Sequence, residues 1–266
     1  MADAGSTSPS SSFTAYGVDG CPAGWLYVGI EPGGALRWGV VPMLTDLVRT
    51  VGDSDRIFVD IPIGLPEGGE GRTCDREARC RLGPRGSSVF SAPVRTVLGI
   101  DTYENANRMN RVAAGKGITK QMFAITRKVQ EVDTLLRQCS KARRLVREVH
   151  PEVCFWAFAG ETPMCLPKKA RAKAGFRERL AVLSNLRTSV PDEVAQIARA
   201  FRRKEVAWDD IADAFVAALT ASQPLERLRT LPAAPETDRN GMPMEMVYAD
   251  ALSSMVAEDP PAPCRS

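Results

Sequence analysis

Apolar residues recur along the chain with two different periods, and the change between them separates predicted strands from predicted helices. Near the N-terminus, three short apolar runs are separated by loops that contain glycine. The pair Gly33-Gly34 supplies the positive φ angles that a tight hairpin turn needs. We therefore expect the fold to open with three consecutive strands, over Ala15–Asp19, Trp25–Ile30 and Leu36–Val41.

A helical pattern follows in Met43–Val51, where Leu44, Leu47 and Val48 share one face. The segment Arg56–Asp60 then returns to a short apolar run that predicts a fourth strand. A strand, helix and strand in succession favour a right-handed crossover between parallel neighbours. The fourth strand should therefore lie parallel to an earlier one.

The remainder of the chain is mostly helical in pattern. Residues 67–140 begin in a glycine-rich loop and continue with helical spacing, which predicts a helical insertion after the fourth strand. Beyond Pro232 the chain is rich in proline, and we expect it to be irregular. The elements expected between these regions are a fifth strand and three helices, over Arg144–Val149, Phe176–Leu186, Val194–Phe201 and Asp209–Ala221.

Length and composition favour one globular domain. The chain has 266 residues, of which 44% are hydrophobic and 25% charged, enough to bury a full core. We expect a disordered arm over 1–12, one α/β domain over 13–230 that includes the 67–140 insertion, and a proline-rich tail over 231–266. No run approaches the roughly 18 apolar residues of a membrane helix, and no signal peptide is recognisable, so we expect a cytoplasmic protein without membrane contact. The seven cysteines contain no CxxC pair, which favours reduced thiols over disulfides or a zinc site.

Acidic side chains stand at the ends of two predicted strands and on the last predicted helix. Asp19 and Asp60 end the first and fourth strands, while Asp210 and Asp213 share one helix face. Taken singly, each has a structural explanation as a turn or cap residue. If they converge, two carboxylates about 4 Å apart repel by about 4 kcal/mol at an effective dielectric of 20. Such oxygen ligands select Mg²⁺ or Mn²⁺, and two ions of this kind can support phosphodiester hydrolysis.

A second group of candidates surrounds the only histidine in the chain. Glu148, His150 and Glu152 alternate, so on extended backbone all three point the same way until Pro151 bends the chain. His150 is a candidate general base, phosphate contact or hydrogen-bonded core residue. A histidine-based zinc site or a Ser-His-Asp triad would depend on this single residue, which makes both unfavourable.

Basic residues provide candidate phosphate contacts. The loop 83–88 offers backbone amides, hydroxyls and Arg85 for a phosphate, although a plain surface loop explains it equally well. Arg79 and Lys128 are further candidates. Between Leu166 and Glu205, eleven basic residues stand against four acidic ones, which suits either a polyanion-binding face or a solvated helical surface.

Six short motifs together resemble the domain of unknown function 429 family, described as predicted nucleases of the RNase H fold. The resemblance covers roughly residues 15–225 and implies an RNase H-like mixed five-stranded sheet flanked by helices. Asp210–Ala214 is also similar to the final helix of RuvC-type resolvases. The motifs are Gly17–Gly20 with Gly24-Trp25, Val59–Pro66, Cys74–Arg79, Leu82–Phe90, Glu148–Glu152 and Asp210–Ala214.

The resemblance implies a metal-dependent nuclease whose central ligands are Asp19 and Asp60, completed by Asp210 or Asp213. We therefore expect two Mg²⁺ or Mn²⁺ ions and a nucleic-acid partner, either RNA, DNA or a hybrid. A non-catalytic nucleic-acid-binding or scaffold protein, and an ATP-binding member of the superfamily, remain alternatives. The predicted metal ligands are Asp19, Asp60 and Asp213; the predicted catalytic residues are these three with Glu148 and Asp210; the predicted substrate contacts are Arg79, Arg85, Lys128, His150 and Glu152.

Overall fold

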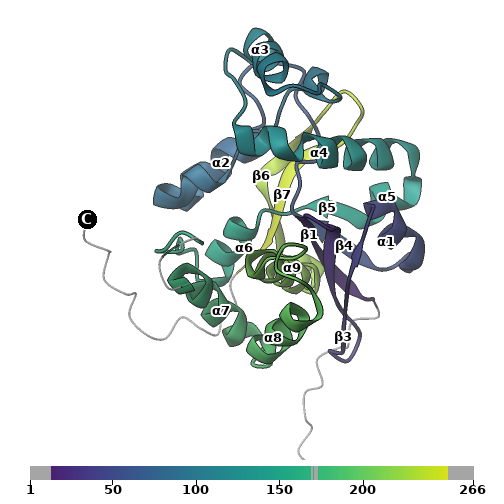
Figure 1. Cartoon of the computed structure of the whole chain (residues 1–266), viewed down its shortest axis with the longest axis vertical. Coiled ribbons are helices and arrows are strands. Elements are labelled where there is room, and N and C mark those ends of the chain that lie inside the picture. The colour runs from purple at the N-terminus through teal and green to yellow at the C-terminus, as the bar shows by residue number, and fades with distance from the viewer. Residues whose placement is uncertain (1–12, 169, 171–172, 251–266) are drawn as a thin grey trace, which may run out of the picture.

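A mixed five-stranded sheet with helices on both faces forms the centre of the molecule (Figure 1). The computed structural model describes residues 13–168, 170 and 173–250. The strand order is β3-β2-β1-β4-β5, with β2 antiparallel to β1 and β3, and β4 parallel to β1 and β5. This confirms the predicted α/β fold and is consistent with the RNase H type. The strands are β1 Ala15–Cys21, β2 Gly24–Ile30, β3 Leu36–Val41, β4 Arg56–Val59 and β5 Val146–Glu148.

Alternate residues of β1 point to opposite faces of the sheet, and each face has its own layer of helices. Tyr16 and Val18 pack with one layer, and Ala15 packs with the other. The first layer comprises α1 Leu44–Thr50, α4 Lys120–Gln138 and α5 Ser140–Leu145. The second comprises α6 Pro151–Phe158, α7 Ala174–Leu186, α8 Val190–Ala200 and α9 Trp208–Ala221.

Between β4 and β5 the chain is largely helical. It contains α2 Thr73–Leu82, the 3-10 turns η1 Gly83–Ser88 and η2 Arg95–Val97, and α3 Tyr103–Ala114, followed by α4 and α5. The fifth strand is shorter than the predicted Arg144–Val149, because residues to Leu145 complete α5. Helix α6 was not expected from the sequence, which suggested that Pro151 bends an extended segment. Pro151 instead occupies the first position of the helix, where a backbone N–H would have no helical partner and its absence is not destabilising.

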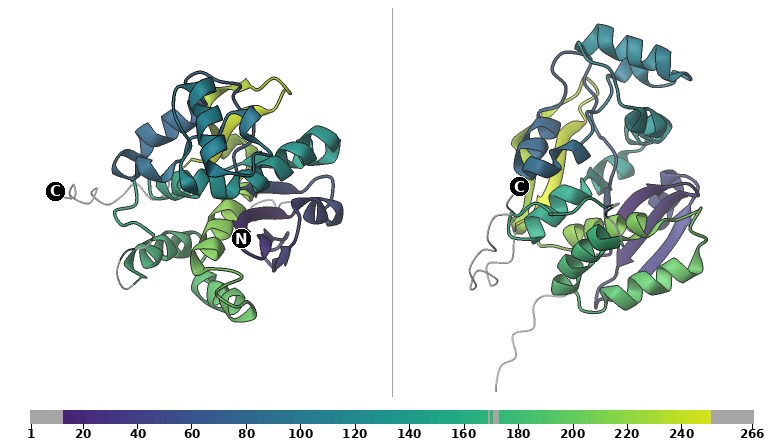
Figure 2. Two further views of the ribbon diagram at one scale, coloured as in Figure 1. Left: turned by 45° about the horizontal axis from the view of Figure 1, so that its top comes forward. Right: turned by 60° about the vertical axis from the view of Figure 1, so that its left-hand side comes forward.

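The expectation of irregular chain beyond Pro232 is wrong for the part that the structure describes. β6 Leu228–Thr237 and β7 Pro243–Ala249 form an antiparallel hairpin beside α2 (Figures 1 and 2). The prolines fit because the register shifts between Leu231 and Glu236, where Pro232 and Pro235 lie. Buried side chains of the hairpin then pack against α2 and α6.

The predicted arm over 1–12 and residues 251–266 of the predicted tail lie outside the described residues. Across residues 13–168, 170 and 173–250, no helix combines the length and the apolar character needed to cross a membrane.

Candidate active site

The register of β1 and β4 brings Asp19 and Asp60 together. Val18 pairs with Val59 in the parallel ladder, so the residues that follow them lie side by side at the same end of the sheet. The backbone N–H of Asp60 donates to the carbonyl of Val18 at 3.0 Å and holds this register beyond the end of β4. Both carboxylates point toward the face that α9 covers, since they alternate with residues packed on the other face.

Helix α9 brings Asp213 to the same place. The helix lies directly against β1 because Gly17 has no side chain: a Cβ there would stand 2.0 Å from the carbonyl oxygen of Ala214 and 2.1 Å from the amide nitrogen of Ala218. This close approach buries Asp213, which is 5% exposed. Asp210 lies one turn earlier and accepts a hydrogen bond from the N–H of Ala207 at 2.8 Å, so it also caps the helix, as its position suggested.

The acids of this cluster hold protons more tightly than ordinary carboxyls. Burial raises the pKa of Asp19 well above its usual range, and the charges of Asp213 and Asp60 raise it further. Burial and the charge of Asp213 raise the pKa of Asp60 to about 8, against the opposing effect of Lys168. Burial also raises the pKa of Asp213 and brings that of Asp210 to about 6. At neutral pH the cluster therefore favours binding a cation, either protons or a metal ion.

Lys168 supplies positive charge to the cluster, and the sequence analysis did not single it out as a site residue. It precedes α7, and its ammonium group forms an ion pair with Asp213. The predicted basic segment marked Lys168 only as a possible surface contact, because nothing in the spacing shows that this lysine turns inward. Arg179 of the same segment is also buried, whereas Arg199 and Arg202 are exposed.

The donor set suits a hard divalent cation, although its present arrangement is not that of a closed metal site. Within the described ranges, no three His, Cys, Asp or Glu side chains are arranged to hold an ion. However, Oδ1 of Asp213 is buried without a hydrogen-bond partner, and no described residue donates a hydrogen bond to the carboxylate of Asp60. Carboxylate oxygens are the ligands that Mg²⁺ and Mn²⁺ prefer, and those that accept no hydrogen bond are available to bind an ion. The other oxygen of Asp213, Oδ2, accepts from the ammonium group of Lys168, which competes with an ion for this carboxylate.

Glu148 and Glu152 are close to this cluster but are paired with arginines. Nη1 and Nη2 of the buried Arg72 donate to the two oxygens of Glu148 at 2.6 and 2.8 Å, and the N–H of Ile63 donates at 2.6 Å. The guanidinium of Arg179 donates to both oxygens of Glu152, at 2.8 and 2.7 Å. Both glutamates line the same cavity as Asp19 and Asp60, and each has its charge paired with a buried arginine, which sequence spacing did not reveal.

The predicted phosphate contacts separate into two groups. Arg85 and Lys128 line the same cavity as Asp19 and Asp60. Nε of Arg85 is buried without a hydrogen-bond partner, and Lys128 Nζ donates to the Gly24 carbonyl at 2.5 Å. Arg79 instead donates to the carbonyl of Val89 at 3.0 Å and to Oγ of Ser91 at 2.8 Å, so it holds its own loop.

His150 lies on the wall of the cavity, at the N-terminus of α6. Burial and the nearby charge of Lys168 lower its pKa to about 4, so the imidazole is neutral at pH 7. Its Nδ1 atom is buried without a hydrogen-bond partner. The side chain is therefore a poor general base at neutral pH but an available hydrogen-bonding group.

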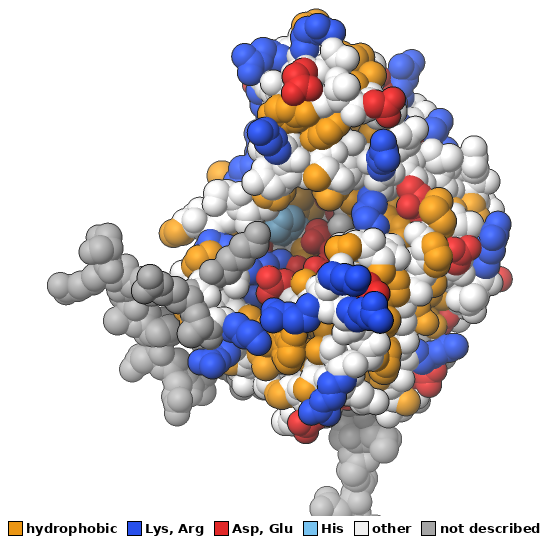
Figure 3. Space-filling view, viewed as in Figure 1, with side chains coloured by type: hydrophobic (Ala, Val, Ile, Leu, Met, Phe, Trp, Pro, Cys, Tyr) orange, Lys and Arg blue, Asp and Glu red, His pale blue; other side chains and the backbone are white. Residues whose placement is uncertain are grey.

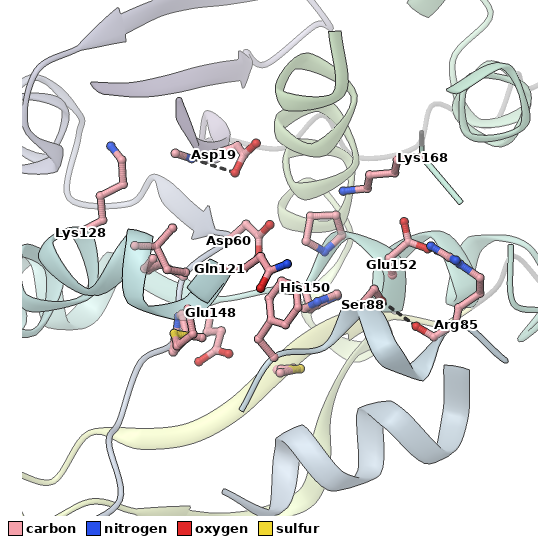
Figure 4. Close-up of a pocket in the computed structure, with 18 of the residues that line it drawn as sticks. Asp19, Asp60, Arg85, Ser88, Gln121, Lys128, Glu148, His150, Glu152 and Lys168 are labelled. Atoms are coloured by element: carbon pink, nitrogen blue, oxygen red, sulfur yellow. Dashed lines mark hydrogen bonds and ion pairs between the residues drawn. The ribbon is translucent and has the colours of Figure 1, made fainter. Parts of the chain in front are cut away.

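These residues surround a cavity of about 540 Å³. Figure 3 shows the hollow, with acidic side chains on its floor and the pale blue His150 on its wall. Figure 4 shows Asp19 and Asp60 close to each other, with Lys168 and Lys128 on opposite sides of them. Apolar side chains complete the lining: Phe90 after η1, Met122 and Ile125 of α4, and Met246 of β7.

Comparison with known proteins gives a family but no activity. No curated protein and no solved structure matches the chain. The profile of one family, described as "Protein of unknown function (DUF429)", matches residues 17–237. This match includes all three elements that carry the acid cluster and nearly all of the cavity wall. The chain therefore belongs to the DUF429 family.

Proposed function

We propose that this protein is a divalent-metal-dependent nuclease that hydrolyses phosphodiester bonds of nucleic acid. The observation that carries the proposal is that Asp19 and Asp60 line one cavity (Figure 4) and that the buried Asp213 is close enough for its charge to raise the pKa of both. A purely structural cluster would be neutralised by arginines, as Glu148 and Glu152 are in the same region. The clustered aspartates instead keep oxygen atoms free for a cation.

Each residue has a distinct role in this proposal. Asp19, Asp60 and Asp213 would hold Mg²⁺ or Mn²⁺, with Asp210 at the edge of the site. When bound, the ions would supply a water of lowered pKa and charge stabilisation for the leaving oxygen. Lys168, released from Asp213, would then lie beside the substrate phosphate and stabilise its negative charge.

The basic and neutral residues of the wall would orient the substrate. Arg85 and Lys128 line the cavity; Nε of Arg85 has no hydrogen-bond partner and lies 3.8 Å from Oε2 of Glu152. Both basic side chains would contact phosphate oxygens. His150 would hydrogen-bond the substrate in its neutral form, since a pKa of about 4 leaves it uncharged at pH 7. The thiols of Cys21, Cys74, Cys80, Cys139 and Cys154 suit action in the reducing cytoplasm.

Cleavage of labelled oligonucleotides tests the proposal. Single-stranded, duplex, hybrid and branched substrates should be incubated with Mg²⁺ or Mn²⁺ and wild type, Asp19→Asn, Asp60→Asn or the exposed control Asp53→Asn. We expect cleavage by wild type and the control, and a loss of several orders of magnitude in the two site variants. Absence of cleavage in every combination, or full activity of Asp60→Asn, would contradict the nuclease. Binding without cleavage would favour a non-catalytic nucleic-acid-binding protein.

A further inference from the structure

We infer that the cavity receives one unpaired nucleotide of a nucleic-acid strand, so the substrate is single-stranded or locally unpaired. This inference rests on the proposed function and specifies its substrate. Its basis is the shape and lining of the cavity above Asp19 and Asp60, which differ from those of a surface that follows a double helix.

The size of the cavity excludes a duplex. A volume of 540 Å³ corresponds to a sphere about 10 Å across, narrower than the major groove of B-DNA alone at about 12 Å. It lies within the roughly 300–1,000 Å³ range of sites that enclose small molecules. A single nucleotide can enter such a space, whereas the two paired strands cannot.

The depth of the acids leads to the same conclusion. Of the two acids that line the cavity, Asp19 is 8% exposed and Asp60 is half-buried, and the acidic floor lies within the hollow in Figure 3. The phosphates of an intact duplex lie on its outer surface, where they would meet the rim of the cavity. A phosphate can reach the acids only if its nucleotide leaves the stack, as occurs in enzymes that extrude a base from the duplex.

The lining provides separate surfaces for the parts of a nucleotide. Phe90, Met122, Ile125 and Met246 contribute apolar side chains to the lining, and a base can pack against such side chains in a sequence-tolerant way. The unpartnered Nδ1 of His150 can meet a polar edge of the base. Lys168 and Arg85 carry positive charge near the position of the phosphate.

Binding measured without metal tests this inference separately from cleavage. Fluorescence anisotropy in EDTA should compare a labelled single strand, its perfect duplex, and the same duplex with one unpaired nucleotide. We expect the single strand and the bulged duplex to bind wild type at least about tenfold more tightly than the perfect duplex, from a base contact of 1–3 kcal/mol. Equal affinities for all three would overturn the inference.

Two variants locate the contact in the cavity. Phe90→Ala should weaken single-strand binding about tenfold and leave duplex binding unchanged, whereas Phe123→Ala, on α4 but outside the cavity lining, should bind as wild type does. Ile125→Trp places a larger side chain in the lining, narrows the cavity and should have the same selective effect, with the exposed Val112→Trp as its control. Melting curves confirm that each variant is folded. Full single-strand affinity in folded Ile125→Trp would overturn the inference.

The binding and cleavage measurements together separate this inference from the nuclease proposal. Selective binding of unpaired strands without cleavage would uphold the cavity assignment and contradict the nuclease. Cleavage of perfect duplex at the rate of single strand would uphold the nuclease and overturn the assignment. A free nucleoside monophosphate that displaces the strand at equal concentration would also overturn the assignment to a strand.

Discussion

Replacing one acid of the cluster should stabilise the protein when no metal is present. In Asp60→Asn the side chain keeps its size and gains an amide group that can donate hydrogen bonds to neighbouring carboxylates. The substitution also removes a negative charge that Asp19 and Asp213 repel. Removing a buried acid usually lowers stability, so an increase would identify electrostatic repulsion at this site.

The raised pKa of Asp60 sets the size and the pH range of the stabilisation expected in Asp60→Asn. In the unfolded chain the carboxyl ionises near its ordinary value of 3.8, and in the folded protein near 8. The folded state therefore binds more protons between these values, and wild-type stability falls as pH rises from about 4 to 8. At pH 7 this difference between the folded and unfolded pKa lowers the free energy of unfolding of the wild type by about 4 kcal/mol, at 1.36 kcal/mol per pH unit. Neighbouring acids share these protons, so we expect a gain of about 2 kcal/mol, or about 4–8 °C in Tm.

Thermal and urea denaturation in EDTA at pH 4, 6 and 8 would measure the effect. The gain of Asp60→Asn over wild type should be near zero at pH 4 and largest at pH 8, and Mn²⁺ should stabilise wild type more than the variant. Asp133→Asn is the control, because the carboxylate of Asp133 is also in the interior but accepts from Arg95 at 2.6 Å and pairs with Arg137. It should lower stability at pH 6 and 8. If Asp60→Asn behaves like Asp133→Asn at pH 8, the repulsion inferred here is absent.

Three further substitutions test other parts of the site. Lys168→Met should bind Mn²⁺ about tenfold more tightly by calorimetry, because the ammonium group no longer competes for Asp213. Arg72→Met leaves the buried carboxylate of Glu148 without its partner and should lose about 3–5 kcal/mol in urea denaturation. Gly17→Ala forces α9 away from β1 and should lose about 3 kcal/mol or more while weakening Mn²⁺ binding.

Each of these substitutions has a matched control. Lys204→Met removes an exposed lysine and should leave Mn²⁺ affinity unchanged. Arg76→Met, on the exposed side of α2, should change stability by less than about 0.5 kcal/mol. Gly52→Ala places its Cβ 3.4 Å from the nearest atom and should be tolerated. Weaker Mn²⁺ binding by Lys168→Met would contradict the competition of Lys168 for Asp213. Wild-type stability of Arg72→Met would contradict the pairing of Arg72 with Glu148, and wild-type stability of Gly17→Ala would contradict the close packing of α9 on β1.

The local pattern of the chain was sufficient to predict the sheet and the acids at its edge. Short apolar runs that end in Asp19 and Asp60 indicate strands, and the helix between them favours a parallel pair, whose equivalent ends meet. Asp213 followed from helical spacing beside an apolar stripe. These predictions succeeded because period and chain direction are local properties that the strand register then preserves.

Only the tertiary structure decided which charged residues neutralise one another. Glu148 and Glu152 resembled site residues in the sequence, yet Arg72 pairs with the first from 76 residues away and Arg179 with the second from 27. Lys168 shows the reverse case, in which a residue not expected in the site belongs to it. It pairs with Asp213 across 45 residues of sequence and places a positive charge inside the site. Ion pairs depend on distance in space and on burial, and neither follows from periodicity. The sequence alone therefore determined where the acids converge, and the packing of distant segments decided which of them are paired with a buried arginine or lysine.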